Sequence, residues 1–417
     1  MVKTGVNLQK LKEQNSFSIL HVIREHGPVS RSQVGKILGL SNTTCMELAR
    51  HLISRGLIRE KGQGDSSGGR KPILLEINWE YNFVIGMILS QEGVSCGVYD
   101  LQINKKELVS HNVKLTGKEI VARIKECAFE AIHKSHLTEE NIAGMTIGVG
   151  GIVDAAKANI MGSTHFQSRE IIHIHDQLDS IFPFPLYLEN YGNLMALAEK
   201  KLYYPQCESL VFIQVDTGIG GGIICNNKII RGANGYAGEI GHMTIEKNGP
   251  MCFCGNKGCL EVMGSIPVLL QKASFGLLTQ RDSLIRKFMD SDTVTIEAIV
   301  KAFQAHDRLA EQLFEEEAAI LYHAALNIIL TYDPEVIVLG GDIVLFGEAF
   351  LNRIQQSVQK TIFDVNSENR VIAFSRLTDQ PRVCGAGIYA VESFFTDHVV
   401  YPDQTHIKHP HRIISPV

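Results

Sequence analysis

Three short stretches near the N-terminus place an apolar residue about every three or four positions, which is the spacing of an amphipathic helix. The first stretch ends at Gly27-Pro28, where a helix stops. Ser30 is a predicted N-cap for the second stretch, RSQVGKIL, and Ser41 for the third, NTTCMELARHLISRG. The expected apolar faces hold Phe17, Leu20 and Ile23 in the first, Val34, Ile37 and Leu38 in the second, and Cys45, Leu48, Ala49 and Leu52 in the third.

The second and third stretches are separated only by the turn Gly39-Leu40-Ser41, as in a helix-turn-helix. Two β-type runs, Leu57–Glu60 and Ile73–Ile77, follow and predict a winged helix. The candidate DNA contacts are the polar face of the third helix and the end of the wing, namely Asn42, Thr43, Met46, Glu47, Arg50, Arg70 and Lys71. The alternative is a small three-helix protein-binding module with a solvated basic face.

The distribution of charge favours DNA binding by this N-terminal part. The whole chain has a formal net charge of −5, which alone argues against nucleic acid. Residues 1–72 nevertheless carry 12 Lys and Arg against 5 Asp and Glu, so the remaining residues hold the acidic excess. A basic segment on an acidic body is typical of a protein with a separate nucleic-acid-binding domain.

From Phe83 onward, apolar β-type runs alternate with helical stretches, which predicts an α/β body. A chain of 417 residues is long enough for two or three domains with substantial cores. The N-terminal residues lack the apolar core of a signal peptide, and we expect no run long enough to span a bilayer. Nine cysteines, an odd number, fit a reducing compartment better than a disulfide framework. A cytoplasmic protein without membrane contact is expected.

One imidazole and three thiols lie close together in the Gly-rich stretch GEIGHMTIEKNGPMCFCGNKGCLE. They are His242, Cys252, Cys254 and Cys259. A Cys₃His set supplies the four ligands that a closed tetrahedral zinc site needs. The alternatives are reduced structural cysteines or a redox pair. We expect a structural Zn²⁺, because reduced cysteines rarely cluster without a metal or a catalytic reason.

The segments G-E-I-G-H-M and C-F-C-G-N-K-G-C-L-E resemble the signature of the ROK family of repressors, open reading frames and kinases, over about residues 83–395. The resemblance implies a two-lobed, actin-like fold of the ribonuclease-H-like type, with the zinc loop in the second lobe and a ligand cleft between the lobes. The expected domains are the winged helix-turn-helix at 1–80, lobe one at 81–205 with a returning helix at 383–396, lobe two at 206–382, and a tail at 397–417.

ROK kinases carry a D-x-G-G-T phosphate turn and a catalytic Asp in the motif E-N-D, and this chain departs from both. Ile88 stands in place of the first Asp, Ser90 and Gln91 in place of the glycines, and Glu92 in place of the Thr. Tyr191 stands where the kinases have the general base, and its ordinary pKa near 10 makes it a poor base at neutral pH. Phosphoryl transfer would lack both positioning and charge stabilisation. We therefore expect no kinase activity and assign no catalytic residue.

Two further glycine-rich segments resemble nucleotide-binding parts of the family, Asp216–Gly222 and residues 336–342. We interpret them as a tight hairpin and an ordinary turn after a strand, because a scaffold can keep its turns without the chemistry. The tail contains His406, His409 and His411 among prolines, which indicates a disordered or surface segment rather than a metal site.

The resemblance also implies a sugar site. Its residues would be Asn190, Glu239, His242 and Glu261, with Tyr191 stacking on the sugar, bonding to it or closing the pocket. Carboxylates and an amide suit vicinal hydroxyls, because together they accept and donate several hydrogen bonds. Zinc would hold His242 and the loop that carries Glu261 as a preformed wall. The alternative is that these groups only support the zinc loop.

The combined prediction is a sugar-responsive transcriptional repressor of a carbohydrate-utilisation operon, from the family branch with xylose-responsive and N-acetylglucosamine-responsive repressors. Its partners would be operator DNA and a small sugar effector, and it would act as a homodimer or higher homo-oligomer. The main alternative is an ATP-dependent ROK sugar kinase with an accessory DNA-binding domain. A third possibility is a repressor controlled by a protein or by a phosphorylated sugar.

Overall fold

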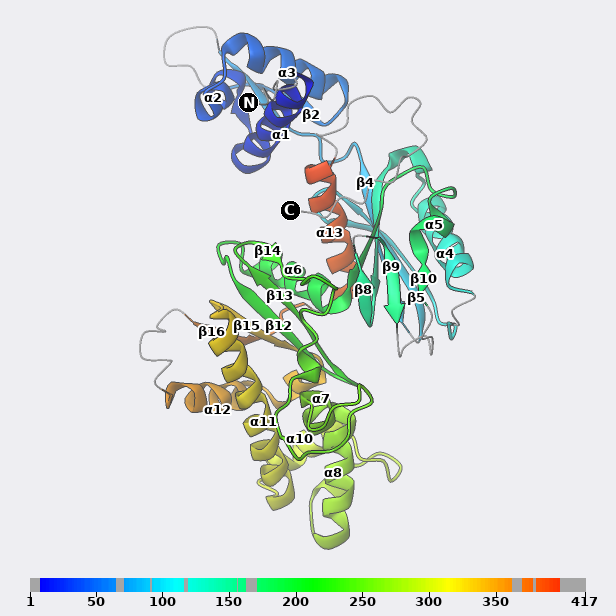
Figure 1. Ribbon diagram of the computed structural model, residues 1–417, viewed down its shortest axis with the longest axis vertical. Coiled ribbons are helices and arrows are strands. Elements are labelled where there is room, and N and C mark those ends of the chain that lie inside the picture. Colours follow the sequence, from blue (N-terminus) through cyan, green and yellow to red (C-terminus); the bar gives the residue numbers. More distant parts are fainter. Residues whose placement is uncertain are drawn as a thin grey trace, which may run out of the picture. The chain divides into compact units, whose positions relative to one another are not determined.

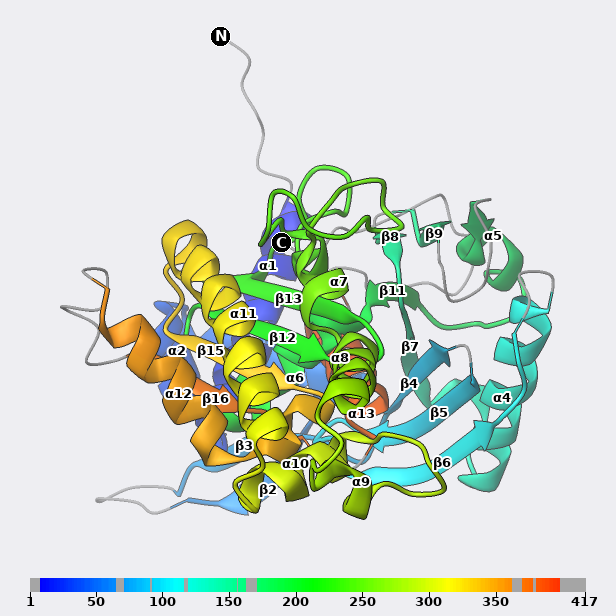
Figure 2. The ribbon, with the colours of Figure 1, turned by 90° about the horizontal axis from the view of Figure 1, so that it is seen from below.

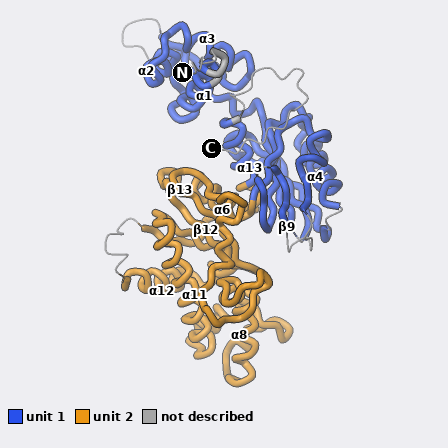
Figure 3. Tube along the Cα trace, in the orientation of Figure 1, with its two compact units in different colours: residues 1–189, 386–417 blue, residues 190–385 orange. Residues whose placement is uncertain are grey.

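The computed structural model describes residues 8–64, 71–90, 92–115, 119–155, 157–162, 171–361, 370–377 and 380–397. The chain divides into two compact units, one of residues 1–189 with 386–417 and the other of residues 190–385 (Figures 1 and 3). Each unit has a five-stranded sheet. The domain limits expected from the sequence remain a proposal.

The first unit begins with the expected winged helix. Its elements are α1 (Leu8–His26), β1 (Val29–Ser30), α2 (Arg31–Leu38), α3 (Asn42–Ser54), β2 (Ile58–Gln63) and β3 (Ile73–Ile77). The strands form one sheet in the order β1-β3-β2. The three predicted helices and two predicted strands are confirmed. The short strand β1 was not expected from the sequence, because two residues are too few to show an alternating pattern.

Both predicted N-caps are present. The Ser30 hydroxyl accepts a hydrogen bond from the backbone N–H of Gln33 at 3.3 Å, and the Gln33 side chain accepts one from the Ser30 N–H at 3.0 Å. The Ser41 hydroxyl accepts from the N–H of Thr44 at 3.1 Å. These bonds satisfy backbone donors that have no partner within the helix. The predicted stripe of α3 is buried throughout, at Cys45, Leu48, Ala49 and Leu52.

The predicted apolar face of α2 is wrong at one residue. Ile37 is 53% exposed, and the buried residue beside Val34 is Gly35. A Cβ added at Gly35 would lie 3.2 Å from the carbonyl oxygen of Leu40 and 3.8 Å from the Cβ of Cys45. The side of α2 that carries Gly35 therefore faces α3 at close range. Helical spacing alone does not reveal this, because a glycine is not counted as part of an apolar stripe.

The α/β part of the first unit is built on a sheet with the order β11-β7-β4-β5-β6. Helix α4 packs on this sheet and shares its apolar core. The elements are β4 (Phe83–Ser90), β5 (Gly93–Asp100), β6 (Lys105–His111), α4 (Ile120–Lys134), β7 (Ile142–Val149), β8 (Ile152–Asp154), β9 (Asn159–Gly162), β10 (Ile172–His173), α5 (Ile174–Leu178) and β11 (Leu186–Asn190), with α13 (Pro381–Asp397) returning at the end. Strands β8, β9 and β10 form a small separate sheet.

The second unit repeats the same strand order, in the sheet β14-β13-β12-β15-β16. Helices α8, α10, α11 and α12 share one core with this sheet, and Figure 2 shows α8 and α11 in front of β12 and β13. The elements are α6 (Tyr191–Tyr203), β12 (Leu210–Val215), β13 (Ile219–Cys225), β14 (Lys228–Ile229), η2 (Ile240–His242), α7 (Leu260–Gly264), α8 (Ile266–Thr279), α9 (Ile285–Phe288), α10 (Ile296–Gln304), α11 (Arg308–Tyr332), β15 (Val336–Gly340), η3 (Asp342–Phe346), α12 (Glu348–Gln359) and β16 (Val371–Phe374).

Among the residues that the structure describes, one segment is long and apolar enough to cross a membrane, contrary to the expectation from the sequence. It is Leu260–Thr279, with a mean hydropathy of 1.2. The segment is not one straight helix, because Ser265 separates α7 from α8 with an extended backbone. The inward face of α8, including Leu269 and Leu277, belongs to the core of the second unit. Packing in this core explains the apolar residues on that face, whereas Phe275 and Leu278 on α8 are 62% and 69% exposed.

Candidate functional site

Residues His242 to Cys259 form a tightly turned loop in the second unit. His242 is the last residue of η2, and Cys259 is the N-cap of α7. Thr244 and Cys259 are paired in an isolated antiparallel bridge. Gly258 has φ +62°, and a Cβ added there would lie 1.6 Å from the carbonyl oxygen of Glu246. Only glycine fits this position, and the turn it permits brings Cys259 back toward His242.

The four predicted metal ligands come together at this loop. Their ligand atoms all lie within 4.8 Å of one another. Nδ1 of His242 is 3.6 Å from Sγ of Cys252, and the Sγ atoms of Cys254 and Cys259 are 3.7 Å apart. A tetrahedral zinc ion bound at about 2.0–2.3 Å from each ligand requires ligand atoms roughly 3.5–3.8 Å apart. The donor set and its spacing therefore fit zinc.

The cysteines are present as free thiols, which both a metal site and a reduced redox pair require. All nine are free, and the separation of the Cys254 and Cys259 sulfurs is far longer than a disulfide bond of about 2.05 Å. Burial, followed by the neighbouring thiols, raises the pKa of Cys259 to about 12. A thiol in this position needs a bound cation to become a thiolate ligand.

Two predicted sugar contacts, Glu239 and Glu261, lie beside this loop. Nε2 of His242 is 4.0 Å from a carboxylate oxygen of Glu239, so the ring nitrogen that faces away from Cys252 is directed toward a carboxylate. The pKa of Glu239 is raised, mainly by burial and further by Glu261, while His242 opposes the shift. Glu261 accepts a hydrogen bond from the backbone N–H of Ile219 at 3.0 Å. The structure brings Glu239, His242 and Glu261 together.

The other two predicted contacts begin helix α6 in the same unit. The Asn190 side-chain oxygen accepts a hydrogen bond from the N–H of Gly192 at 2.7 Å and thereby caps the helix, with Tyr191 as its first residue. A Cβ added at Gly192 would lie 1.9 Å from the carbonyl oxygen of Gly221 in β13. Helix α6 thus packs closely on β13, the strand that also contacts η2 at Ile240. The Asn190 oxygen therefore caps α6, and this structural role is in addition to the predicted contact with a sugar.

Arg382 is a site residue that the sequence did not reveal. Its guanidinium carbon lies 5.2 Å from the centre of the Tyr191 ring, and its Nη2 atom is 3.6 Å from a carboxylate oxygen of Asp216. The Gln214 amide also donates to Asp216, at 3.3 Å. Asp216 lies in the β12–β13 hairpin, as the tight-turn interpretation predicted. No local pattern could have identified Arg382, because the two residues it contacts lie far away in the sequence.

The stretch that corresponds to the first phosphate turn lies in the first unit. Ile88 is buried within β4, and β4 and β5 remain paired as far as Ser90 and Gly93. The Ser90 hydroxyl accepts a hydrogen bond from the N–H of Glu92 at 3.2 Å. Gln91 lies outside the described residues. Glu92 therefore places an exposed carboxylate at this turn, and its glycine, Gly93, packs against the backbone of His111, where an added Cβ would lie 1.9 Å from the carbonyl oxygen.

The predicted DNA-contacting face of α3 is exposed. Its members are Asn42, Thr43, Met46, Glu47 and Arg50. The Glu47 carboxylate accepts a hydrogen bond from Lys12 at 2.9 Å, and this bond and the charge of Lys12 lower the pKa of Glu47. Of the two predicted wing residues, Lys71 is exposed, whereas Arg70 lies outside the described residues, as does the histidine-containing tail.

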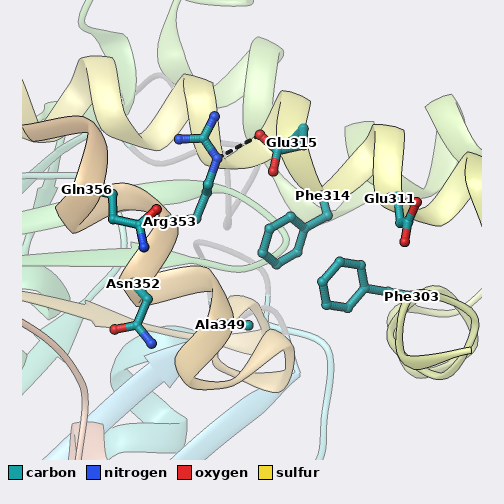
Figure 4. Close-up of a pocket in the computed structure, with 8 residues that line it drawn as sticks. All are labelled: Phe303, Glu311, Phe314, Glu315, Ala349, Asn352, Arg353 and Gln356. Carbon is teal, nitrogen blue, oxygen red and sulfur yellow. Dashed lines mark hydrogen bonds and ion pairs between the residues drawn. The ribbon is translucent and has the colours of Figure 1, made fainter. Parts of the chain in front are cut away.

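A hollow of about 340 Å³ lies elsewhere in the second unit, between α10, α11 and α12 (Figure 4). The rings of Phe303 and Phe314 line it and are stacked on each other, with centroids 4.2 Å apart. Arg353 donates to Glu315 at 2.7 Å on one side. None of the predicted sugar or metal residues lines this hollow.

Comparisons with known proteins match both parts of the chain. Residues 92–392 match the model of the ROK family, and residues 12–59 match that of a winged helix-turn-helix DNA-binding domain. The chain is 30% identical to a putative xylose repressor of Caldicellulosiruptor sp. strain Rt8B.4, over 94% of this chain and 98% of that one. It is 28% identical to an N-acetylglucosamine repressor of Escherichia coli O6:H1 strain CFT073, over 89% of this chain and 91% of that one.

A solved structure extends the match to the fold. It is a ROK family transcriptional regulator, a homologue of the E. coli MLC protein, with a TM-score of 0.82 and 22% identity over 94% of this chain and 99% of that one. The expected fold class, a winged helix-turn-helix followed by an actin-like two-lobed body, is confirmed.

Proposed function

The chain belongs to the ROK family, and we infer that it is a sugar-responsive transcriptional repressor. The observation that carries this inference is a complete winged helix, with a polar and exposed face on α3, ahead of a ROK body in one chain. Relatives that match this chain over most of its length are named putative xylose repressor and N-acetylglucosamine repressor. Its place of action would be the cytoplasm, where the DNA is.

For DNA binding, we propose that α3 enters the major groove. The exposed face of α3 would contact base edges through Asn42, Thr43, Met46, Glu47 and Arg50. The wing residues Arg70 and Lys71 would bind phosphates or enter the minor groove. Glu47 is also paired with Lys12 of α1 in an exposed ion pair, and contact of Glu47 with a base edge would replace this pairing. A homodimer would place two such helices on a palindromic operator.

For the effector, we propose a monosaccharide bound by Asn190, Tyr191, Glu239, His242 and Glu261. Support comes from the contact of α6 and η2 with the same strand, β13, and from the nearness of Glu239 and Glu261 to His242. A structural Zn²⁺ on His242, Cys252, Cys254 and Cys259 would fix the tautomer of His242, so that Nε2–H can donate to a carboxylate or a sugar hydroxyl. Zinc would supply rigidity here and take no part in a reaction.

We further propose that the kinase activity of the family is lost. Three features support this: the buried Ile88 in the first phosphate turn, Tyr191 in place of a general base, and the Arg382–Asp216 pair in the second turn. An internal cation on Asp216 competes with any metal–phosphate complex for the same carboxylate. The rival proposal, a sugar kinase with an accessory DNA domain, predicts ADP release with some sugar.

The test is a DNA-shift titration with duplexes that the protein selects from a random-sequence pool. The sugar probes are D-xylose, D-glucose and N-acetyl-D-glucosamine, each with its phosphorylated form. We expect at least one neutral sugar to weaken DNA binding at least 10-fold, within the usual range of allosteric coupling. A response to phosphorylated sugars alone would favour the third possibility, and no response to any probe would contradict the proposal.

A further inference from the structure

Helix α13 contributes to both compact units. Its residues up to Gly385 group with the second unit, and those from Ala386 onward group with the first. A Cβ added at Gly385 would lie 2.7 Å from the carbonyl oxygen of Leu194 in α6. A Cβ added at Gly387 would lie 2.8 Å from the ring of Tyr99 in β5. These two glycines, in the first half of α13, let the helix pack closely against α6 in the second unit and against β5 in the first.

The beginning of α13 lies at the proposed effector site. Arg382, in its first turn, lies over the ring of Tyr191 and pairs with Asp216. Tyr191 is also the first residue of α6, whose packing on β13 leaves no room for a side chain at Gly192. A ligand that shifts the Tyr191 ring therefore acts directly on the first turn of α13.

The end of α13 contacts the winged helix. Nη2 of Arg24, in the last turn of α1, donates to a carboxylate oxygen of Glu392 at 2.5 Å, and Nη1 lies 3.5 Å from the other oxygen. The guanidinium carbon of Arg24 also lies 4.2 Å from the centre of the Phe395 ring. The side chains of Arg24 and Glu392 are only 22% and 27% exposed. This is a forked, partly shielded ion pair, a type of contact that fixes orientation.

The segment that joins the winged helix to the body also contacts α13. The Trp79 ring packs edge-on against Phe395, with centroids 6.1 Å apart. Two residues further on, the Tyr81 ring covers Gly56, where an added Cβ would lie only 2.6 Å from the ring. Phe395 is therefore contacted by α1 through Arg24 and by the connecting segment through Trp79.

We propose that α13 transmits the state of the effector site to the DNA-binding domain, with Arg24, Glu392 and Phe395 as the positioning contacts. The proposal rests on the proposed function and names the route by which the sugar acts. A helix of 17 residues is about 25 Å long and stiff, so a displacement at Arg382 reaches Glu392. Loss of the Arg24 contact should leave the base-reading face of α3 intact and should remove its response to the sugar.

The chain offers a direct probe, because Trp79 is its one tryptophan. Fluorescence of the full-length protein is recorded while D-xylose or N-acetyl-D-glucosamine is added, and DNA affinity is measured in parallel. The variants are Arg24→Gln, Glu392→Gln and the charge-exchanged double variant Arg24→Glu with Glu392→Arg. The control is Arg123→Gln, which removes an exposed ion pair with Glu126 on α4.

We expect the sugar to change Trp79 emission in the parent protein and the control. Each single variant should bind DNA within about 3-fold of the parent without sugar, and its sugar-dependent change in DNA affinity should be at least 5-fold smaller. Sugar affinity itself, from calorimetry, should remain unchanged. The exchanged double variant should regain the response. Single variants that respond like the parent would overturn the proposal.

A second readout needs no sugar and separates this proposal from the proposed function. Hydrogen exchange of the amides in the last turn of α1 should be at least 10-fold faster in each single variant and slow again in the exchanged double variant. If no sugar acts on the parent protein, the proposed function fails, and this readout still reports on the contact. Unchanged exchange in both single variants would show that Arg24 and Glu392 do not position α1, and the proposal would be wrong.

Discussion

The loop of residues 242–259 in the second unit, called the zinc loop after its proposed metal, and the β4–β5 turn of the first unit differ in the chemistry that their residues suit. In the zinc loop, one imidazole and three thiols meet at distances that suit a tetrahedral metal, and Glu239 and Glu261 lie beside them. In the β4–β5 turn, Ile88 is buried and the exposed group at the tip is the carboxylate of Glu92.

This difference separates two requirements that a kinase must meet together. Binding a neutral sugar requires hydrogen-bonding groups held in fixed positions. Transferring a phosphate also requires close backbone approach, charge neutralisation and a base. The second unit can meet the first requirement without help from the β4–β5 turn. A sugar sensor can therefore persist after the phosphate site is lost.

Removal of a zinc ligand is expected to have the largest effect. Cys259→Ser should reduce bound zinc from about one ion per chain to near none and lower the free energy of unfolding by roughly 4 kcal/mol or more, because metal binding and folding of such a loop are coupled. Metal analysis and urea unfolding measure both. Cys225→Ser, at a half-buried cysteine outside the cluster, is the control. Full zinc content in the Cys259 variant would contradict the assignment.

A change in the proposed sugar wall should have the next largest effect. Glu261→Gln keeps an acceptor for the Ile219 N–H and removes the charge, so the loop should fold normally. Sugar affinity, measured by calorimetry with the sugar that acts on DNA binding, should fall roughly 10- to 100-fold, the usual range for a lost hydrogen bond to a charged group. Glu246→Gln, at an exposed loop position, should change affinity little. Equal affinities in both variants would remove Glu261 from the site.

A buried carboxyl group that packs against α7 should make the stability of the protein depend on pH. Glu317 in α11 is 1% exposed, and a Cβ added at Gly264 of α7 would lie 2.8 Å from its carboxyl. Burial raises the pKa of Glu317 to about 8, and the charge of Lys272 opposes the shift. The folded state therefore holds one more proton than the unfolded state between about pH 4.5 and 8. This group makes the protein less stable as pH rises through that window.

Glu317→Gln has no such proton to lose. The gain in the free energy of unfolding that the substitution gives over the parent protein should therefore be larger at pH 7.5 than at pH 5, by roughly 3 kcal/mol. Urea unfolding at the two pH values measures this difference. The control is Glu348→Gln, at an exposed position in α12 of the same unit, where the difference should be the same at both pH values. A pH-independent effect of Glu317→Gln would mean that the carboxyl stays charged in the fold.

Restoring the kinase base alone should have no effect on turnover. Tyr191→Asp supplies a carboxylate at the start of α6, yet Ile88 and Glu92 would still prevent productive phosphate binding. An ADP-release assay with D-xylose, D-glucose and N-acetyl-D-glucosamine should give the same background rate as the parent protein. Sugar-dependent ADP from this variant would show that the β4–β5 turn still serves ATP.

Local patterns in the sequence predicted the features that depend on neighbouring residues. The caps at Ser30 and Ser41, the buried stripe of α3 and the strand runs of the body were all confirmed. The cluster of one histidine and three cysteines that could hold a metal was also evident, because its residues lie within one short loop and a glycine such as Gly258 is needed to close it. Such features need no knowledge of tertiary contacts.

Contacts between distant segments could not be predicted in this way. Arg382 approaches Tyr191 and Asp216 only because α13 returns to the body after the last strand. Glu392 and Arg24 lie at opposite ends of the chain, and nothing in either local sequence marks them as a pair. The error at Ile37 has a similar origin, because its exposure depends on how α2 meets α3.

The central claim is that sugar binding acts on DNA without phosphate transfer. Its most direct test is a titration of the protein–DNA complex with the active sugar, with and without Mg²⁺ and ATP, while ADP is monitored in the same sample. We predict that DNA is released at the same sugar concentration in both cases and that no ADP forms. Release that requires ATP, or ADP that accumulates with the sugar, would contradict the claim.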